Sequence, residues 1–209
     1  MKNYSKNQLK RYPIYLKYFK ELEAQGEETV SSPKIAKVLG YSEEQIRKDL
    51  QAVSNTPGRP KKGRNIAKLI DTLETFLGYK GDIKAVIIGC GHLGQALLRY
   101  PNFNDMGLSI VCGFDVDQSL IGTNVDGKEI YNLEDINVKF KEVGASIAII
   151  TVPVNFAQGV ADKAIEAGAK GLWNFAPTHL NAPSKIVIEN FNFSSSLAVL
   201  MHDLAEKGN

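Results

Sequence analysis

The sequence predicts an α/β protein in two parts, an all-helical part followed by a part built on a parallel sheet. Through residues 1–80, apolar side chains recur at the i, i+3, i+4 and i+7 spacing of amphipathic helices. From Lys84 onward they form short continuous runs, which are typical of strands covered on both faces. Helical segments alternate with these runs, and that alternation is the pattern of a parallel α/β sheet.

The composition favours a protein of the cytoplasm. The 209 residues are 44% hydrophobic and 23% charged, and no apolar run is long enough to span a membrane. The N-terminus carries no apolar stretch of the kind that secretory signals have. Cys90 and Cys112 lie in apolar runs and make no disulfide framework, so we expect a reducing compartment.

Charge divides the chain at the same point as the apolar pattern. Residues 1–80 hold 16 basic and 9 acidic side chains, whereas residues 81–209 hold 9 basic and 14 acidic ones. A basic part joined to an acidic part suggests that only the first meets a polyanion such as nucleic acid. Charge alone does not decide this, because many basic helical domains bind no nucleic acid.

A long helix is expected over residues 7–24, at the start of the first part. Pro13 lies inside this run, and we expect it in the first turn of a helix that starts near Tyr12, where its missing N–H costs little. A helix over residues 66–77 ends the part, with Asn65 as its N-cap and Gly78 as its stop.

A helix-turn-helix pattern lies between those two helices. Ser32 is expected to cap a helix whose first residue is Pro33, and Gly40 ends it. Ser42 then opens a second helix, and Gln45 makes a capping box with it. The apolar residues expected to face inward are Ile35, Val38, Leu39, Ile46, Leu50 and Val53.

In a helix-turn-helix the second helix enters the major groove of DNA, and its N-terminal residues reach base edges. The DNA-binding residues expected from this pair of helices are Ser32, Lys34, Gln45, Arg47, Lys48 and Gln51. Arg is suited to guanine and Gln to adenine, while Lys48 suits a phosphate. A solvated helix face would give the same polar pattern.

A basic segment of prolines and glycines follows the second helix of this pair. Its cations are Arg59, Lys61, Lys62 and Arg64. Such a segment resembles an AT-hook, and a narrow A·T-rich minor groove attracts Arg. We therefore predict that Arg59 inserts into such a minor groove. The alternative is a flexible basic linker.

The second part has five expected strands, at residues 85–88, 109–114, 146–152, 171–174 and 185–188. Helices are expected over 93–100 and 156–167, the second of them capped by Asn155. A last amphipathic helix is expected over 194–206. Its apolar side is made of Leu197, Leu200, Met201 and Leu204.

A glycine-rich turn follows the first of these strands and opens a helix. It reads Gly89, Cys90, Gly91, His92, Leu93, Gly94. The first glycine allows the tight turn, the second lets a pyrophosphate approach the backbone, and the third lets the helix pack on the strand. The helix N-terminus offers free N–H groups to the phosphates. The sequence therefore predicts a dinucleotide site here.

The end of the next strand, 21 residues after Gly94, indicates which dinucleotide binds. Asp115, followed by Val116 and Asp117, can accept hydrogen bonds from the adenosine ribose. Two carboxylates would repel the 2′-phosphate of NADP, so the sequence favours NAD(H). Another nucleotide, or CoA, stays open as an alternative ligand.

Two further strand ends are expected beside the nicotinamide, because ligands of open parallel sheets bind outside the carboxyl ends of strands. The residues concerned are Thr151, Val152, Pro153, Asn174, Ala176 and Pro177. Ordinary turn chemistry would also explain the two prolines. His179 is the only histidine placed for acid–base catalysis.

We expect no catalytic residue and no metal site, because residues 79–209 are nearly all needed for one dinucleotide domain. That leaves no substrate domain. Two rival hypotheses remain: a small NAD-dependent oxidoreductase that uses His179, and a regulator that binds CoA or another nucleotide. Substitution of His179 would test the first rival, and a ligand screen by thermal shift would test the second.

The order of these motifs resembles the Rex family of redox-sensing repressors over nearly the whole chain. The resemblance rests on Ser31-Ser32 and on residues 45–50, 89–94, 114–117, 151–153 and 174–177, followed by the terminal helix. It implies a winged-helix domain at 1–80 and a Rossmann NAD(H)-binding domain at 81–190. It also implies that residues 191–209 hold a helix that swaps onto the partner of a homodimer.

The resemblance further implies how the protein responds to redox state. NADH closes the dimer and releases a palindromic operator, while NAD+ competes for the same site and leaves the protein able to bind DNA. Tyr100 and Phe193 would lie against the nicotinamide, Phe193 from the partner chain. An apolar pocket there disfavours the cationic ring, so we expect NADH to bind more tightly than NAD+.

Two features depart from the family's pattern. The family often has an Asp at the position of Asn192, which switches between an Arg of the first helix and the Tyr near the nicotinamide, here Arg11 and Tyr100. A neutral Asn forms no salt bridge, so this switch is expected to be weakened or replaced by hydrogen bonds. The wing carries a Pro-Gly-Arg-Pro run in place of an aromatic-glycine pattern, which leaves the operator preference open.

Overall fold

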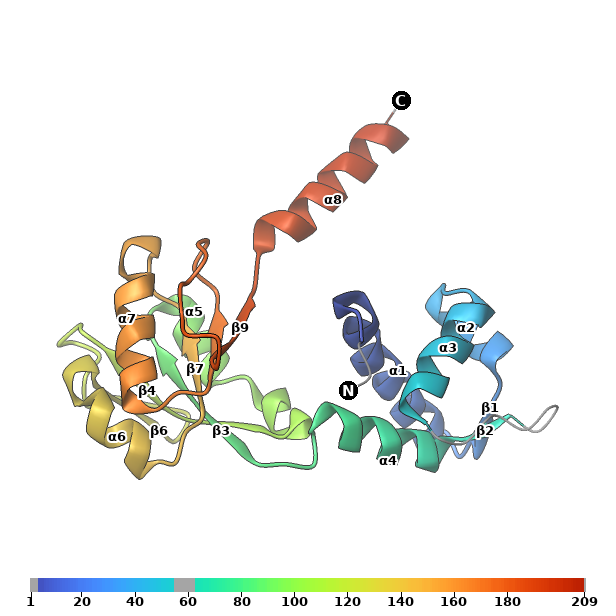
Figure 1. Ribbon diagram of the computed structural model, residues 1–209, viewed down its shortest axis with the longest axis horizontal. Helices are drawn as coiled ribbons and strands as arrows, with labels where there is room; N and C mark the ends of the chain where they lie inside the picture. Colours follow the sequence, from blue (N-terminus) through green and yellow to red (C-terminus); the bar gives the residue numbers. More distant parts are fainter. Residues whose placement is uncertain (1–3, 55–62, 209) are drawn as a thin grey trace. The chain divides into compact units, whose positions relative to one another are not determined.

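The computed structural model describes residues 4–54 and 63–208 of the chain (Figure 1). These residues form two compact units, divided between residues 80 and 81. Of the expected DNA contacts in the basic segment, Arg59, Lys61 and Lys62 lie outside the described residues. Among the helices of the described ranges, none is long and apolar enough to cross a membrane.

The first unit is a helical domain with a small antiparallel sheet (Figure 1). Its elements in order are α1 (Lys6–Ala24), β1 (Thr29–Val30), α2 (Ser32–Leu39), α3 (Glu43–Val53), β2 (Arg64–Asn65) and α4 (Ile66–Leu77). Val30 pairs with Arg64 across the sheet. The predicted helix-turn-helix is confirmed as α2 and α3, and the two strands add the base of a wing.

Local capping fixes where these helices begin and end. Ser31, not Ser32, caps α2, because its Oγ accepts from the Lys34 N–H at 3.3 Å, so the predicted start is wrong by one residue. Ser42 caps α3 as predicted, since its Oγ accepts from the Gln45 N–H at 3.2 Å. Val38 was expected to face inward, yet it is 57% exposed.

The predicted start of the first helix is wrong as well. α1 begins at Lys6, because the Ser5 hydroxyl caps it by accepting from the Gln8 N–H, and Pro13 lies well inside the helix. An interior proline costs about 3 kcal/mol or more. Packing offsets that cost, since α1 buries an aromatic-rich face on both sides of Pro13. The buried residues of α1 are Tyr12, Tyr15, Leu16, Tyr18, Phe19 and Leu22.

The second unit contains a seven-stranded sheet in the order β5-β6-β4-β3-β7-β8-β9. The strands are β3 (Ile83–Ile88), β4 (Leu108–Asp115), β5 (Asn124–Val125), β6 (Lys128–Asn132), β7 (Ile147–Ile150), β8 (Gly171–Asn174) and β9 (Val187–Asn190). All neighbours pair in parallel except β5 and β6. The order reverses between β3 and β7, which is the crevice where such sheets bind ligands. The sequence predicted the parallel sheet but missed β5 and β6.

Helices cover both faces of this sheet (Figure 1). They are α5 (His92–Leu98), α6 (Ile136–Glu142) and α7 (Val154–Ala167), with short 3₁₀ helices η1 (Pro101–Met106) and η2 (Leu133–Asp135). In β3, Val86 and Ile88 lie in the core shared with α6 and α7, whereas Ala85 and Ile87 lie in the core on the α5 side. This alternation explains the continuous apolar run, because both faces of the strand are buried.

Three predicted boundaries in this unit are wrong by a few residues. Asn155 was expected to cap α7, but the helix begins at Val154 with Pro153 as the capping residue. The last strand lies at Val187–Asn190 rather than at 185–188. β7 ends at Ile150, so Thr151 and Val152 belong to the loop beyond it. Because β7 is shorter than predicted, residues 151–153 form a loop beyond its carboxyl end rather than part of the strand.

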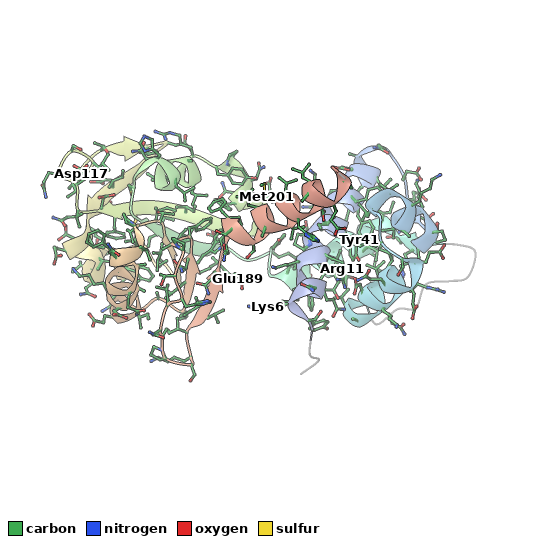
Figure 2. All side chains as sticks on the ribbon, turned by 90° about the horizontal axis from the view of Figure 1, so that it is seen from above. Lys6, Arg11, Tyr41, Asp117, Glu189 and Met201 are labelled. Carbon is green, nitrogen blue, oxygen red and sulfur yellow. The ribbon has the colours of Figure 1, made fainter. Side chains whose placement is uncertain are left out.

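The chain ends in helix α8 (Phe193–Lys207), drawn in red in Figure 1 and carrying the labelled Met201 in Figure 2. Asn192 caps it, because its Oδ1 accepts from the Ser194 and Ser195 N–H groups. No residue of this helix is buried. The apolar side predicted for it is 56–59% exposed at Leu197, Leu200, Met201 and Leu204.

Candidate functional site

The glycine turn between β3 and α5 has a steric reason for two of its three glycines, Gly89 and Gly94. Gly89 has φ +96°, and a Cβ there would lie 2.7 Å from Val152. A Cβ on Gly94 would lie 2.0 Å from the Gly89 carbonyl oxygen, so only glycine lets α5 pack here. A Cβ on Gly91 would meet nothing within 4 Å, and this residue is exposed. The backbone at Gly91 is therefore open to a ligand.

Asp115 fastens this turn to the neighbouring strand. Its Oδ2 accepts from the Cys90 N–H at 2.5 Å, and its Oδ1 accepts from the Val116 and Asp117 N–H groups at 2.7 and 2.9 Å. Asp117, labelled in Figure 2, accepts from the Ser119 hydroxyl and N–H, and these hydrogen bonds lower its pKa. Asp115 and Asp117 therefore place two carboxyl groups at and just beyond the end of β4, and Asp115 is bonded to the glycine turn.

Cys90 contributes only its backbone to the outer side of the turn. Its side chain is fully buried, and burial raises the pKa of the thiol to about 12. The Sγ donates to the Phe114 carbonyl oxygen at 3.6 Å and fills the space beside Gly113, where a Cβ would lie 2.4 Å from it. The thiol is thus protonated at neutral pH and serves packing, whereas His92 and Leu93 are exposed at the start of α5.

The loop after β7 is tied to the same turn. The Thr151 hydroxyl donates to the Gly89 carbonyl oxygen at 2.7 Å. Val152 lies against Gly89, and Pro153 is exposed at the start of α7. The predicted residues after β3, β4 and β7 therefore come together at one edge of the sheet, which is the geometry of a nucleotide crevice.

The loop after β8 is shaped by a buried amide. Asn174 has no exposed surface, and its Oδ1 accepts from the Ala176 N–H at 3.0 Å. Ala176 is buried, while Pro177 and His179 are exposed. The sequence predicted Asn174 as a ligand contact, but its side chain points into the protein and holds the turn.

A row of aromatic rings runs from Tyr100 to Phe193. Successive ring centroids lie 4.8, 5.7, 5.0, 5.1 and 4.7 Å apart along Tyr100, Phe103, Trp173, Phe175, Phe191 and Phe193. Tyr100 and Phe193, the two predicted nicotinamide neighbours, are its ends, and they are 45% and 59% exposed. Sequence reasoning missed Phe103, Trp173 and Phe191 in this row, because the rings come from three stretches of the chain that lie far apart in sequence.

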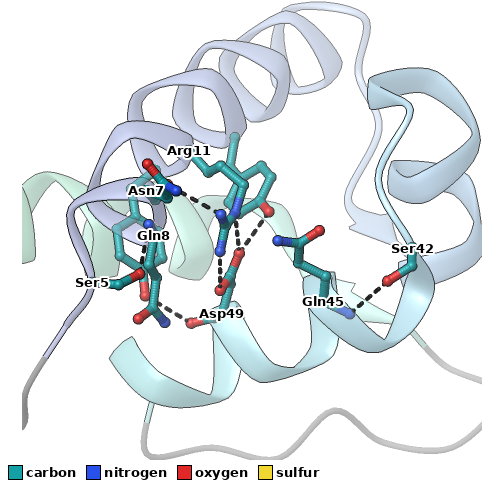
Figure 3. Close-up of polar contacts among 9 residues, drawn as sticks. Ser5, Asn7, Gln8, Arg11, Ser42, Gln45 and Asp49 are labelled. Atoms are coloured by element: carbon teal, nitrogen blue, oxygen red, sulfur yellow. Dashed lines mark hydrogen bonds and ion pairs between the residues drawn. The ribbon is translucent and has the colours of Figure 1, made fainter.

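In the first unit, a buried ion pair joins α1 to the second helix of the helix-turn-helix (Figure 3). Arg11 donates from Nε and from its terminal nitrogen to the two oxygens of Asp49 at 2.7 and 2.9 Å, and Tyr15 donates its hydroxyl at 2.8 Å. The hydrogen bond to Asp49 raises the pKa of Arg11. Sequence reasoning missed Asp49, although it lies between the inward-facing Ile46 and Leu50.

Gln45 turns toward this ion pair rather than outward as predicted (Figure 3). It is half-buried, and with its amide oriented to suit its neighbours, Oε1 accepts from the two terminal nitrogens of Arg11 at 3.1 and 3.3 Å. Its side chain therefore lies over Arg11, and its own N–H groups remain as donors. The second half of the predicted capping box, from Gln45 back to Ser42, is replaced by this contact.

The other predicted DNA contacts of the first unit differ in their surroundings. Arg47, Lys48 and Gln51 are exposed on α3, and Lys48 pairs with Glu44 at 2.7 Å. Lys34 on α2 is exposed and pairs with Glu27 at 2.8 Å. Ser32 and Arg64 are half-buried, and burial lowers the pKa of Arg64. α3 thus presents the exposed polar face of this unit.

Family models match both units. A model described as "Putative DNA-binding protein N-terminus" matches residues 5–51, and one described as "CoA binding domain" matches residues 80–178. Curated relatives match nearly the whole chain. The redox-sensing transcriptional repressor Rex of Bacteroides thetaiotaomicron is 40% identical, over 94% of this chain and 89% of the relative. That of Clostridium botulinum (strain Eklund 17B) is 33% identical, over 99% and 98%.

This chain belongs to the Rex family. The predicted resemblance is therefore confirmed, and Rex relatives are named as transcriptional repressors rather than as oxidoreductases. A solved Rex-family repressor called RSP is 30% identical, with a TM-score of 0.89 over 100% of this chain and 97% of that one. RSP has also been solved with β-NAD+ and operator DNA, at a TM-score of 0.90, and with β-NADH, at 0.88.

Proposed function

We propose that this protein is a redox-sensing transcriptional repressor that binds operator DNA through its first unit and NAD(H) through its second, and that NADH releases it from DNA. The observation that carries the proposal is similarity over 95–97% of the RSP chain, which has been solved with both nucleotides and with operator DNA. The helix-turn-helix of the first unit and the glycine turn of the second unit support it. A repressor of this kind works where the DNA is, so we also propose a cytoplasmic location.

The pyrophosphate of the nucleotide is proposed to lie at Gly91, where the backbone is bare and no Cβ intrudes. The adenosine ribose would then lie at Asp115, which has lone pairs left beyond its three backbone hydrogen bonds. CoA carries a 3′-phosphate and NADP a 2′-phosphate on this ribose. Either phosphate would meet the carboxylates of Asp115 and Asp117, so NAD(H) is the ligand that fits.

The nicotinamide is proposed to lie by the loops after β7 and β8, near the exposed ring of Tyr100. NADH differs from NAD+ here in carrying no charge on the ring. Burying a cationic ring costs several kcal/mol, whereas cation–π contact with aromatic rings returns about 0.5–2 kcal/mol. The neutral ring is therefore favoured, and NADH binds more tightly than NAD+.

Two copies are proposed to form a homodimer by exchanging α8. Every residue of this helix is exposed, and its apolar side has no cover within the described part of its own chain. Exposed apolar surface of this size is costly in water and marks an interface. A two-fold dimer presents two copies of α3, so the operator is expected to be palindromic, read mainly by Arg47 and Gln51, with Lys48 on phosphates.

The test is a titration of operator-bound protein with NADH, NAD+ and NADPH, using an operator selected from random duplexes. NADH alone is expected to release the DNA at micromolar concentration. Equal release by NADH and NAD+, or release by none of the three, would contradict the redox-sensing function. Stabilisation by CoA and not by NADH in a thermal shift would instead assign the second unit to CoA.

A matched pair of glycine variants locates the nucleotide. Gly91→Val places a side chain in open space at the turn, so the fold should persist while the pyrophosphate is blocked. We expect operator binding unchanged and the NADH response lost. Gly159→Val puts the same side chain at an exposed glycine of α7 that also meets nothing within 4 Å, and it should leave the response intact.

A further inference from the structure

Asn174 is the last residue of β8 and carries the most buried polar side chain of the second unit, with 0% exposure. Its Nδ2 has three oxygens within hydrogen-bond reach: the Thr178 carbonyl at 2.8 Å, the Asn190 Oδ1 at 2.9 Å and the Ala176 carbonyl at 3.2 Å. An amide nitrogen has two hydrogens, so three acceptors compete for two donors.

Two of these acceptors belong to the turn that follows β8. The Ala176 and Thr178 carbonyl oxygens accept from Asn174, and the Ala176 N–H donates back to its Oδ1. This is the loop at the carboxyl end of the sheet, where the nicotinamide is proposed to lie. The side chain of Asn174 therefore sets the conformation of the loop that faces the ligand.

The third acceptor belongs to the segment that leads into α8. Asn190 ends β9, and the next residue, Phe191, donates its N–H to the Asn174 carbonyl oxygen at 2.7 Å. The rings follow the same path, since Phe175 stacks on Phe191 at 5.1 Å and Phe191 contacts Phe193, the first residue of α8, at 4.7 Å. One residue thus holds the ligand-facing turn and the root of the terminal helix together.

Asn is the residue type that this place requires. An Asp would direct a carboxylate at three oxygens, and an apolar residue would leave the turn's backbone groups without their partner. Because the donors are shared among three acceptors, a small shift of the turn changes how strongly Asn190 is held.

We propose that Asn174 is a positioning residue that transmits occupancy of the nucleotide site to α8, and that its hydrogen bond to Asn190 is the link. This rests on the proposed function. Asn190 is exposed, and the contact that ties its side chain is the one to Asn174. It can therefore be changed while the turn contacts of Asn174 remain.

The experiment measures the dissociation constant of NADH from free full-length protein and from operator-bound protein. Their ratio is the coupling between the two ligands. Asn190→Ala removes the acceptor and should reduce this ratio at least fivefold toward one, while NADH affinity of the free protein changes less than twofold. Asn190→Asp keeps an acceptor oxygen at the same place and should keep the ratio within twofold of the parent chain.

A ratio that Asn190→Ala leaves unchanged would overturn the proposal, as would equal losses in the Ala and Asp variants. Sedimentation measures the dimer in parallel. If Asn190→Ala loses coupling only because the dimer dissociates, the bond holds the helix and transmits nothing, and the proposal fails. A ratio of one in the parent chain would instead refute the redox-sensing function itself, which separates the two failures.

Discussion

Among the residues that the structure describes, two polar side chains are buried, and each unit holds one of them. Asp49 in the first unit is a charged group, paired with Arg11 and with the Tyr15 hydroxyl. Asn174 in the second unit is a neutral amide, satisfied by backbone carbonyls and by Asn190. Both side chains are removed from water. Burial of Asp49 is compensated mainly by a cation, whereas burial of Asn174 is compensated by neutral hydrogen-bond partners.

The buried ion pair and the buried amide differ in how much movement of their partners they tolerate. A buried charge must keep its partner, because an unpaired one costs several kcal/mol. Arg11 and Asp49 lie 38 residues apart in sequence, so their pair fixes α1 against α3. A neutral amide with three acceptors can shift among them at little cost. The first unit thus holds α3, the proposed DNA-reading helix, against α1, and we propose that the second lets the loop after β8 and the start of α8 respond to the nucleotide.

The largest effect expected from this comparison is on the stability of the first unit. Arg11→Met leaves Asp49 buried without its cation and should lower the free energy of unfolding by about 3–5 kcal/mol. Thermal unfolding followed by circular dichroism measures the loss. The double variant Arg11→Met/Asp49→Asn removes both charges and should recover at least half of it. A double variant as unstable as the single one would show that shape, not charge, holds the helices.

The surroundings of Arg11 show how much of the first unit could be predicted from the sequence. The apolar periodicity predicted α3 and its inward residues Ile46 and Leu50, because that pattern depends on neighbouring positions. It missed the inward Asp49, since the partner that makes a buried charge tolerable lies on a distant helix. Pro13 was misplaced for the same reason, as the packing that offsets its cost is tertiary.

In the second unit the glycine turn and Asp115 could be predicted, because their roles follow from a short motif. The edge hairpin β5–β6 could not, since its strands are short and carry few apolar residues. The aromatic row could not either. Its members, such as Phe103 and Trp173, are brought together only by the order of the strands.

A smaller loss of stability is expected at the buried amide. Asn174→Leu leaves backbone groups of the turn without their partner and should cost about 1–3 kcal/mol. Urea unfolding can be followed by the fluorescence of Trp173, the only tryptophan of the chain and the neighbour of Asn174. Asn190→Leu, at an exposed position, should cost less than about 0.5 kcal/mol. Equal losses of stability in the two variants would mean that the buried hydrogen bonds of Asn174 add nothing beyond what an exposed asparagine contributes.

The next effect concerns base preference rather than stability. Arg11 occupies the Oε1 of Gln45, so the side chain offers only N–H donors. A donor-only amide suits guanine N7 and O6, whereas adenine needs a donor and an acceptor together. Selection of binding duplexes should therefore show a preference for guanine over adenine of about 1 kcal/mol at one base position. The variant Gln45→Ala should lose the preference at that position.

The Arg11→Met/Asp49→Asn variant frees the oxygen of Gln45 and should move that preference toward adenine. The stability and the base choice of the first unit would then depend on the same ion pair. If the double variant folds and its base preference is unchanged, Arg11 contributes to stability but not to base preference. Loss of all operator binding in that variant would place the ion pair, rather than Gln45, at the DNA.

The smallest effect is at a surface pair on the exposed face of α3. Lys48 and Glu44 are 74% and 70% exposed, so water screens their attraction and Glu44→Gln should leave stability nearly unchanged. If Lys48 reaches a phosphate, the change frees it and removes a negative charge, so operator affinity should rise about two- to threefold in low salt.

The matched control is Glu142→Gln, which breaks a similar pair with Lys139 in the second unit. Both substitutions remove one negative charge from the chain, but only the one on α3 does so beside the proposed DNA contact. At 0.1 M salt, charges more than about 10 Å apart are largely screened from one another, so only Glu44→Gln should strengthen binding. Equal gains from the two variants would mean that net charge alone, and not the face of α3, attracts the operator.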